Sequence, residues 1–378
     1  MIFAFSAEQN ELRSVVRAFL ERRSPESEVR RLMATTDGYD TATWKHLATQ
    51  IGLQGLTIPE EFGGAGGSFV ELGIVLEEMG RSLLCAPFFA TAVLAANALL
   101  HSGDKAAMSD YLPGIASGDT VATVAFVEDA GRWDAEGIQM RAERDGGQWR
   151  LTGAKTFVLD GLTADVLIVA ARTADGVSLF AVRAAADGLH RAPLRTLDET
   201  RKQARVEFSG TPARLIGAVG AGWTTLAGVL DLAAVALAAE QVGGAQRCLD
   251  MAVEYAKQRV QFGRPIGSFQ AVKHKCADML LEVETARSAA YYAMWAAAGE
   301  SDDLSVVASL AKAHCSDAYF HVAAENIQVH GGIGFTWEHP AHLYFKRAKS
   351  SQLLFGDAIY HRGLFAQRSD LHATPPGK

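Results

Sequence analysis

The segment from residue 259 to 270 gathers side chains that could hold a phosphate-bearing ligand. It contains a cation, Arg259, an aromatic ring, Phe262, and an amide side chain, Gln270. Gly263 and Pro265 predict a tight turn within it. An arginine and the free backbone amides of a helix N-terminus both bind phosphate well. The pattern therefore suits a phosphate-bearing cofactor, although an ordinary helical hairpin with an incidental arginine would have the same composition.

Two helices are predicted on either side of this turn. Residues 223–257 contain no proline, are rich in alanine and leucine, and have few interior charges, which is typical of a mostly buried helix. Residues 268–298 carry apolar side chains at steps of three and four, which predicts an amphipathic helix. The candidate segment is therefore held between the end of one long helix and the start of another.

Several segments resemble the acyl-CoA dehydrogenase flavoprotein family. Residues 242–279 are similar to one signature of that family, and residues 328–340, followed by 346–349, are similar to a second. Near the N-terminus, residues 58–66 and 76–81 are similar to a third. These segments agree with the family in order and spacing, and the chain agrees in length, so the resemblance covers nearly the whole sequence.

The resemblance implies an α+β chain with the acyl-CoA dehydrogenase fold. It predicts an N-terminal α domain over residues 1–118, a central β-barrel-like domain over 119–215, and a C-terminal α domain over 216–378 containing a four-helix bundle. Residue patterns agree with this expectation. Strand-like runs at 120–126, 165–170 and 177–182 alternate with Asp-Gly turns, whereas helical patterns dominate before and after them.

FAD is the cofactor that the resemblance implies, bound across a subunit interface. The positions that match its pyrophosphate and adenosine side in the family are Arg259, Gln261, Phe262, Ile266, Phe269 and Gln270, completed by Gln328, Gly331 and Gly332. On the flavin side the sequence departs from the family. The loop at 127–134 is one residue shorter than its family counterpart, and residues 157–159 read Phe-Val-Leu where the family often has Trp-Ile-Thr. Phe157 is expected to pack on the flavin ring, but Leu159 has no hydroxyl to donate.

The family's reaction is α,β-dehydrogenation of an acyl-CoA thioester, in which a carboxylate removes the α proton and hydride passes to N5 of FAD. Neither usual position of that base holds a glutamate, because they are occupied by Phe355 and Ala233. Glu240 lies seven residues after Ala233, about 10 Å further along the helix axis, and burial makes a carboxyl group a better base. Glu240 is the candidate catalytic residue, with a buried carboxylate paired to an arginine as the alternative. Asp357 is the second substitute, with a cofactor contact or a surface position as its alternative.

Three hypotheses about function remain open. The first is a catalytic FAD-dependent acyl-CoA dehydrogenase, and the second is a non-catalytic subunit that helps bind FAD for a glutamate-bearing partner. The third is a related flavin monooxygenase or oxidase. The implied partners are an acyl-CoA substrate, identical or homologous subunits forming a homotetramer or heterotetramer, and an electron-transfer flavoprotein or a similar acceptor.

Composition limits the remaining classes of function. The formal charge of −7 gives no general attraction to nucleic acid. The uncharged stretch at residues 215–230 is shorter than the roughly 20 residues of a membrane span, and the first residues do not form a secretory signal. Four widely spaced cysteines predict reduced core residues in a cytoplasmic protein. The histidines lack the spacing of metal ligands. Residues 374–378 are predicted to be disordered.

Overall fold

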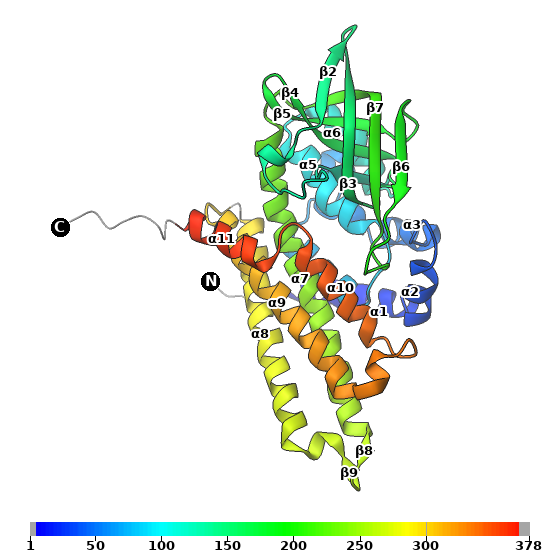
Figure 1. Cartoon of the computed structure of the whole chain (residues 1–378), viewed down its shortest axis with the longest axis vertical. Coiled ribbons are helices and arrows are strands. Elements are labelled where there is room, and N and C mark those ends of the chain that lie inside the picture. Colours follow the sequence, from blue (N-terminus) through cyan, green and yellow to red (C-terminus); the bar gives the residue numbers. More distant parts are fainter. Residues whose placement is uncertain (1–4, 300, 370–378) are drawn as a thin grey trace, which may run out of the picture. The chain divides into compact units, whose positions relative to one another are not determined.

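The computed structural model describes residues 5–299 and 301–369 (Figure 1), so the predicted disorder of residues 374–378 lies outside the described part. The chain divides into two compact units. The first unit comprises Met1–Val29, Phe69–Leu84 and Ala234–Lys378, and the second comprises Arg30–Ser68 and Cys85–Ala233. The three domain boundaries expected from the sequence stay a prediction.

Helices build the first unit. Its helices are α1 (Ala7–Arg23), α4 (Phe69–Arg81), the larger part of α7 (Gly222–Gln258), α8 (Gln270–Ala298), α9 (Leu304–His330), α10 (Ala341–Leu353) and α11 (Ala358–Arg368). Helices α7, α8 and α9 run side by side in Figure 1. Arg287 of α8 donates to the side-chain oxygen of Gln246 of α7, and Gln241 of α7 donates to the hydroxyl of Ser316 of α9. The helices predicted at 223–257 and 268–298 are confirmed.

Helix α10 was not predicted. Its buried residues include His342 and Arg347 among Leu343, Tyr344 and Ala348. Buried polar side chains interrupt the apolar repeat by which an amphipathic helix is recognised. The segment therefore has helical structure without a helical hydrophobic pattern.

Helix α7 crosses the first unit beside α4, and glycines permit a close approach of the two. A Cβ atom on Gly243 would lie 1.7 Å from the carbonyl oxygen of Glu77, and one on Gly80 would lie 2.0 Å from that of Glu240. Helix α7 is long and apolar enough to cross a membrane, but 61% of its most apolar window is buried inside the protein. This burial is typical of a core helix.

Replacing Gly243 with alanine is expected to lower the free energy of unfolding by at least about 2 kcal/mol, because α4 and α7 must separate to admit a methyl group. Gly228 provides a matched control in the same helix, since nothing lies within 4 Å of a Cβ atom built there. Gly228→Ala should stabilise the protein by roughly 0.5–1 kcal/mol through helix propensity. Urea unfolding of both variants measures the difference, and equal effects would show that the contact is not tight.

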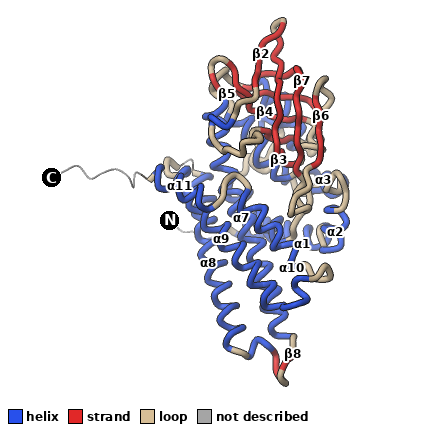
Figure 2. The backbone as a smooth tube through the Cα atoms, in the orientation of Figure 1, coloured by secondary structure: helices blue, strands red, loops and turns tan. Residues whose placement is uncertain are grey.

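A seven-stranded sheet forms the core of the second unit (Figure 2). Its strands are β1 (Ala122–Ala125), β2 (Arg141–Asp145), β3 (Gln148–Leu159), β4 (Val166–Thr173), β5 (Gly176–Arg183), β6 (Leu189–Pro193) and β7 (Gln203–Ile216). Strands β4, β2, β3, β7 and β5 pair in sequence, and β5 pairs with β4 again, which closes the ring. The predicted barrel-like domain is confirmed in this closure.

Three strands, β1, β4 and β5, coincide with the predicted strand-like runs, and the other four were missed. The missed strands have exposed or mixed faces rather than continuous apolar runs, as the burial of β2 and β6 shows. The Asp-Gly signals lie at strand ends as expected. Asp145 pairs with Gln148 across a two-residue turn, Gly146-Gly147, in which both glycines have positive φ.

Helical segments accompany the sheet in the second unit. They are the end of α2 (Glu26–Met33), α3 (Thr41–Thr49), the π-helical turn Phe89–Ala95, α5 (Ala96–His101) and α6 (Lys105–Ala116). Strand β1 packs against the π-helical turn, where Thr91 Oγ1 donates to the carbonyl oxygen of Ala122 at 3.0 Å. Helical structure before the sheet agrees with the sequence pattern.

Candidate functional site

The 259–270 segment is a small hairpin between α7 and α8. Strands β8 (Val260–Gln261) and β9 (Arg264–Pro265) pair, and the turn residues Phe262 and Gly263 have φ values of +53° and +76°. The amide of Ile266 donates to the carbonyl oxygen of Arg259 at 2.8 Å, which closes the loop. The predicted tight turn between two helices is thereby confirmed in geometry.

Side chains of this hairpin are exposed rather than packed into the first unit. Phe262 is 91% exposed, and its ring meets that of Phe269 edge-on at a centroid distance of 6.1 Å. The Arg264 guanidinium lies 4.1 Å from the centroid of the Phe269 ring. Arg259 is also exposed, and no carboxylate of the described residues forms an ion pair with it. An exposed ring beside an uncompensated cation is suited to a ligand that carries phosphate.

The second predicted segment meets the first at the end of α7. His330, the last residue of α9, stacks on Tyr255 of α7 at a centroid distance of 4.3 Å, and its Nδ1 donates to the carbonyl oxygen of Asn326 at 2.8 Å. A 3-10 helix, η6 (Gly331–Phe335), follows immediately. The structure thus brings the Gln328 to Gly332 segment and the 259–270 hairpin to the same end of the helices, although they are distant in sequence.

Backbone exposure at Gly331 and Gly332 is consistent with ligand contact. A Cβ atom built on either glycine meets nothing within 4 Å, and Gly331 has a φ of +65°. Gln328 is exposed beside them. Bare backbone amides, an amide side chain, an aromatic ring and a free arginine fit the adenosine and pyrophosphate of FAD.

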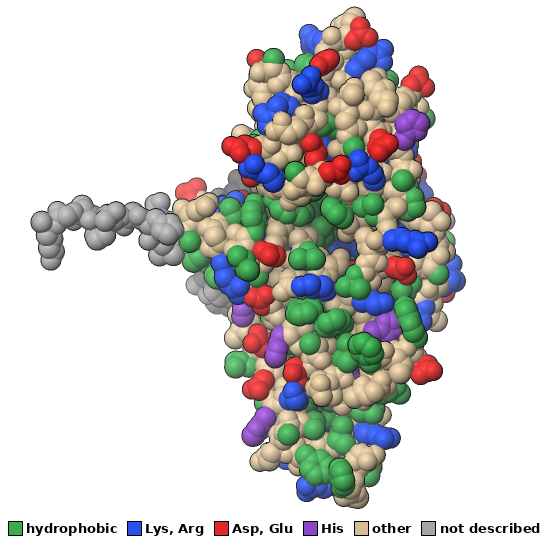
Figure 3. All heavy atoms as spheres, in the orientation of Figure 1, with side chains coloured by type: hydrophobic (Ala, Val, Ile, Leu, Met, Phe, Trp, Pro, Cys, Tyr) green, Lys and Arg blue, Asp and Glu red, His purple; other side chains and the backbone are tan. Residues whose placement is uncertain are grey.

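Exposed hydrophobic side chains accompany these residues in the first unit. Apart from Phe262, those more than three-fifths exposed are Leu281, Phe335, Trp337 and Ile359. Figure 3 shows hydrophobic side chains, in green, gathered over the helical part of the face drawn. Exposed apolar groups of this size commonly mark a surface that a partner covers.

The 127–134 loop of the second unit is anchored near its first residues. Lys155, which is fully buried, donates to the Glu128 carboxylate at 2.7 Å, and the same carboxylate oxygen accepts the amides of Gln139 and Met140. Burial lowers the pKa of Lys155 to about 8, and Glu128 opposes that shift. The tip is bound by ion pairs instead, between Arg132 and Asp134 and between Asp129 and Arg205.

Phe157 and Leu159 point to different environments within the second unit. Phe157 is 50% exposed at a φ of +53°, where the pairing of β3 with β7 shifts register. Leu159 is buried, and its carbonyl oxygen accepts the hydroxyl of Thr123 at 2.6 Å. The exposed ring of Phe157 leaves it accessible to a flavin, and its packing against the ring stays a prediction.

Glu240 lies in an ion pair in the middle of α7. Its Oε1 accepts Nη1 of Arg347 at 2.9 Å, and both side chains are less than 8% exposed. This is the arginine pairing that the sequence left open as the alternative, and α10 provides the arginine. Glu240 also lies about 27 Å along α7 from Gln258, where the helix ends. Its role as a base stays a prediction. To take a proton from a substrate, the Glu240 carboxylate would have to give up its ion pair with Arg347.

The usual base position lies in the turn between α10 and α11. Phe355 is buried there with a φ of +62°, followed by Gly356 at +103°. Asp357 is half-buried and caps α11, because its Oδ1 accepts the amide of Tyr360 at 2.8 Å. Its carboxylate therefore has a structural partner, and a contact with cofactor stays a prediction.

His361 binds the same turn from α11, with its Nε2 3.0 Å from the carbonyl oxygen of Phe355. Burial, reinforced by Lys312, lowers the pKa of this imidazole to about 4. Since the unfolded imidazole titrates near 6.5, the unfolded chain binds more protons between pH 6.5 and 4, so stability is lost as the pH falls through that window.

We expect His361→Gln to reduce the acid loss of stability between pH 6.5 and 4 by up to roughly 3 kcal/mol, since each unit of pKa shift corresponds to about 1.4 kcal/mol. Urea unfolding at a series of pH values measures this slope for both proteins. Identical slopes would mean that the imidazole is not held neutral in the folded state.

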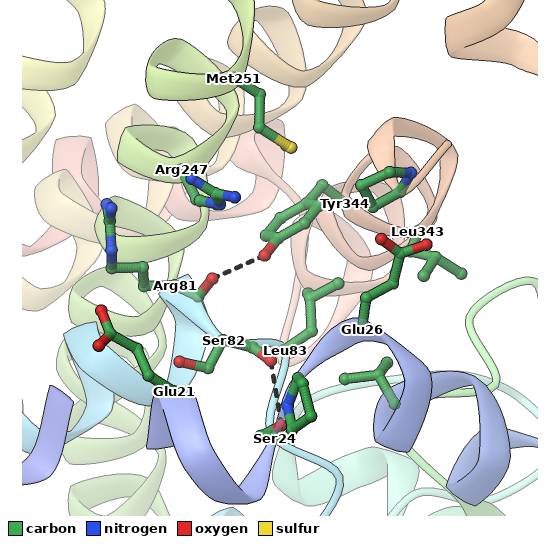
Figure 4. Close-up of a pocket in the computed structure, with 13 residues that line it drawn as sticks. Glu21, Ser24, Glu26, Arg81, Ser82, Leu83, Arg247, Met251, Leu343 and Tyr344 are labelled. Atoms are coloured by element: carbon green, nitrogen blue, oxygen red, sulfur yellow. Dashed lines mark hydrogen bonds between the residues drawn. The ribbon is translucent and has the colours of Figure 1, made fainter. Parts of the chain in front are cut away.

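A separate cavity of about 270 Å³ lies among α1, α4, α7 and α10 (Figure 4). Arg247 and Tyr344 face each other across it, and the Tyr344 hydroxyl donates to the carbonyl oxygen of Arg81 at 2.7 Å. At another wall, the Ser24 hydroxyl donates to the carbonyl oxygen of Ser82 at 3.2 Å. None of the predicted site residues lines this cavity.

Cysteines and metal ligands add no further site in the described part of the chain. All four cysteines are free; Cys85, Cys248 and Cys315 are buried, as the sequence predicted, whereas Cys276 is only half-buried. Burial raises the pKa of the Cys315 thiol to about 12, which leaves it unreactive. No group of three metal-ligating side chains occurs among the residues that the structure describes.

Sequence reasoning missed two buried cations that bear on the candidate base. Arg347 was noticed only as part of a motif, and Lys312 was not singled out, yet both are fully or nearly fully buried. Lys312 contacts the turn that contains Phe355. The signal that could have revealed them is a charged residue on an otherwise apolar helix face, because a buried charge requires a partner.

Comparisons with known proteins agree with this geometry. Three family models match in order: the N-terminal domain of acyl-CoA dehydrogenase at residues 6–119, the middle domain at 123–210, and the C-terminal domain at 220–369. The chain is 38% identical over 354 residues to acyl-CoA dehydrogenase IpdE2 of Mycolicibacterium smegmatis, which covers 93% of this chain and 95% of that protein.

Solved structures give the same result. The Tcur3481-Tcur3483 steroid ACAD G363A variant matches with a TM-score of 0.88 and 33% identity, over 97% of this chain and 98% of that one. The ChsE4-ChsE5 complex from Mycobacterium tuberculosis matches with a TM-score of 0.90 and 30% identity, over 100% of both chains. This chain belongs to the acyl-CoA dehydrogenase family.

Proposed function

We propose that this chain is an FAD-binding subunit of an acyl-CoA dehydrogenase in which a homologous partner subunit supplies the catalytic carboxylate. The observation that carries the proposal is the environment of the base positions. Phe355 occupies one, Ala233 occupies the other, and the nearby carboxylate of Glu240 is in a buried ion pair with Arg347. An apolar ring and a methyl group accept no proton.

The adenine side of FAD is the contribution of this chain. Arg259 and Gln270 supply a cation and an amide for the phosphates, Phe262 and Phe269 supply rings, and the amides at Gly331 and Gly332 are exposed. FAD supplies a hydride acceptor when it is bound. Exposure of these residues on the first unit supports a cofactor shared with another subunit, because a site completed by a partner is open in the single chain.

The substrate of the assembly is an acyl-CoA thioester, and the reaction forms a carbon–carbon double bond between its α and β carbons. The partner's carboxylate takes the α proton, and the β hydrogen leaves with its electron pair as hydride. A steroid acyl-CoA dehydrogenase among the similar structures supports a bulky acyl group. We place the chain in lipid degradation in the cytoplasm, and the four free cysteines agree with a reducing compartment.

A heterotetramer is the assembly that fits this division of roles, with an electron-transfer flavoprotein or a similar carrier as acceptor. Two differently named chains form the similar ChsE4-ChsE5 complex, which supports a mixed assembly. The exposed apolar side chains of the first unit supply surface for subunit contacts. The single chain is therefore expected to bind FAD weakly.

The second candidate function is catalysis by this chain alone, with Glu240 as the base. Burial of Glu240 on α7 favours this candidate, because burial disfavours the charged form of a carboxyl group and so makes the carboxylate a stronger base. Arg347 would have to release the carboxylate during each turnover. This candidate predicts FAD binding and oxidation of the substrate, with reduction of the flavin, in a homotetramer.

Co-expression with a homologous subunit distinguishes the two candidates. The chain is purified alone and together with a glutamate-bearing homologue, and the FAD content per subunit and the mass of each assembly are measured. Stable FAD only in the mixed assembly supports the subunit function. A homotetramer that retains FAD through gel filtration favours the second candidate.

A further inference from the structure

Lys312 lies in α9 and is fully buried. Its Nζ donates to the Ser316 hydroxyl at 3.0 Å and to the carbonyl oxygens of Gln352 and Gly356 at 3.2 and 3.0 Å. An ammonium group has three N–H donors, so these three acceptors use all of them. Burial lowers the pKa of Lys312 to about 7. Burying the charged ammonium group therefore costs free energy, which these three hydrogen bonds offset.

The Gln352 carbonyl lies in the last turn of α10, and the Gly356 carbonyl lies in the turn that joins α10 to α11. Gly356 lies between α10 and α11, so its carbonyl oxygen is not part of either helix. A buried carbonyl oxygen requires a donor, and Lys312 supplies it. Phe355 has a positive φ, which is strained for a residue with a side chain and persists only when its surroundings hold it. His361 binds the Phe355 carbonyl from α11, so the turn is held from two helices.

Lys312 also connects the turn to α7. Ser316 lies within 3.1 Å of Gln241 Nε2, and Gln241 follows Glu240 in α7. Glu240 pairs with Arg347 of α10, the helix that enters the turn. Two buried cations thus tie α10 and its turn to the core helices α7 and α9. The charged or titratable groups near the Lys312 ammonium are Cys315 and Asp317 of α9, Asp357 of the turn and His361 of α11.

We propose that Lys312 is a positioning residue that holds residues 353–357 in one conformation, so that this chain keeps a rigid seat for a catalytic carboxylate that it lacks. The positioning rests on the contacts of Lys312, whereas the identity of the seat rests on the proposed function. Phe355 and Asp357 are presented at fixed positions, and a glutamate introduced at residue 355 would inherit the place of Phe355.

Hydrogen exchange of the full chain, in the assembly in which it is purified, tests the positioning. In Lys312→Met, which cannot donate, the amides of residues 354–361 are expected to exchange at least tenfold faster, while the amides of α8 are unchanged. Lys349→Met is the matched control, because Lys349 lies in α10 and donates to the side chain of Gln352 rather than to the turn backbone. That variant should leave the exchange of the turn at its original rate.

A general loss of stability would accelerate exchange throughout the unit, and that outcome, like an unchanged turn, would overturn the proposal. If Lys312→Met does not fold, Lys312→Gln keeps two N–H donors and should give a smaller, still local acceleration. The exchange readout needs neither FAD nor substrate, so it stands or falls separately from the proposed function.

The seat itself is tested by Phe355→Glu in an FAD-loaded assembly whose partner has its own base replaced by glutamine. Bleaching of the flavin absorbance by acyl-CoA is expected with Phe355→Glu and is expected to be at least tenfold slower when Lys312→Met is added. No bleaching in either variant, together with local loosening in the exchange experiment, would leave the positioning intact and contradict the location of the base.

Discussion

Replacing Glu240 with alanine is expected to lower the free energy of unfolding by about 3–5 kcal/mol, because the change leaves the Arg347 guanidinium buried without its carboxylate. Both side chains are less than 8% exposed, so water cannot replace the lost partner. Urea unfolding followed by circular dichroism measures the change. Glu240→Ala would therefore reduce activity through instability even if Glu240 takes no part in catalysis.

A double variant separates the charge from the packing at this position. Glu240→Leu combined with Arg347→Met removes both charges and is expected to recover most of the lost stability. Glu325→Ala is a suitable control, because its pair with Lys275 is partly exposed and should contribute less than about 1 kcal/mol. Equal effects of Glu240→Ala and Glu325→Ala would contradict the buried ion pair.

Reversing the charge of Arg259 is expected to weaken FAD binding at least about 1000-fold, a loss of about 4 kcal/mol. Arg259→Glu removes a charge-assisted bond to phosphate and places a carboxylate against it. Because Arg259 is exposed, the free energy of unfolding should change by less than about 0.5 kcal/mol. Titration of the assembly with FAD, followed by flavin fluorescence, measures the affinity.

Lys257→Glu is the matched control for this prediction. Lys257 lies in the last turn of α7, two residues before Arg259, is exposed, and undergoes the same change of charge. A loss of affinity confined to Arg259→Glu identifies a specific phosphate contact. Similar losses in both variants would indicate a general electrostatic effect at the end of α7 and would contradict the assigned role of Arg259.

The turn between α7 and α8 was predictable from the sequence because its geometry is local. Residues 259–270 form one turn between two helices, and the turn chemistry of Phe262, Gly263 and Pro265 is visible in the sequence. Stacking of Tyr255 on His330 joins this turn to Gly331, and such a contact over 75 residues has no local signal. The resemblance to a family supplied the pairing that residue patterns could not.

The environment of the base positions was less predictable. Sequence alone placed Glu240 in a buried helix but could not identify Arg347 as its partner, since α10 has no apolar repeat and was not expected as a helix. Lys312 was missed for the same physical reason, because two of its acceptors are backbone carbonyls that lie 40 and 44 residues away, at the end of α10 and in the turn after it. Strands β2, β3, β6 and β7 were missed because their pattern depends on which face the barrel buries.

The central claim is that a partner must supply the catalytic carboxylate, and anaerobic absorbance spectroscopy tests it most directly. A panel of short, branched and steroid-like acyl-CoA thioesters is added to the chain alone, reconstituted with FAD, and to the chain purified with a glutamate-bearing homologue. We expect the flavin band to bleach only in the mixed assembly. Bleaching in the chain alone, abolished by Glu240→Gln, would contradict the claim and identify Glu240 as the base.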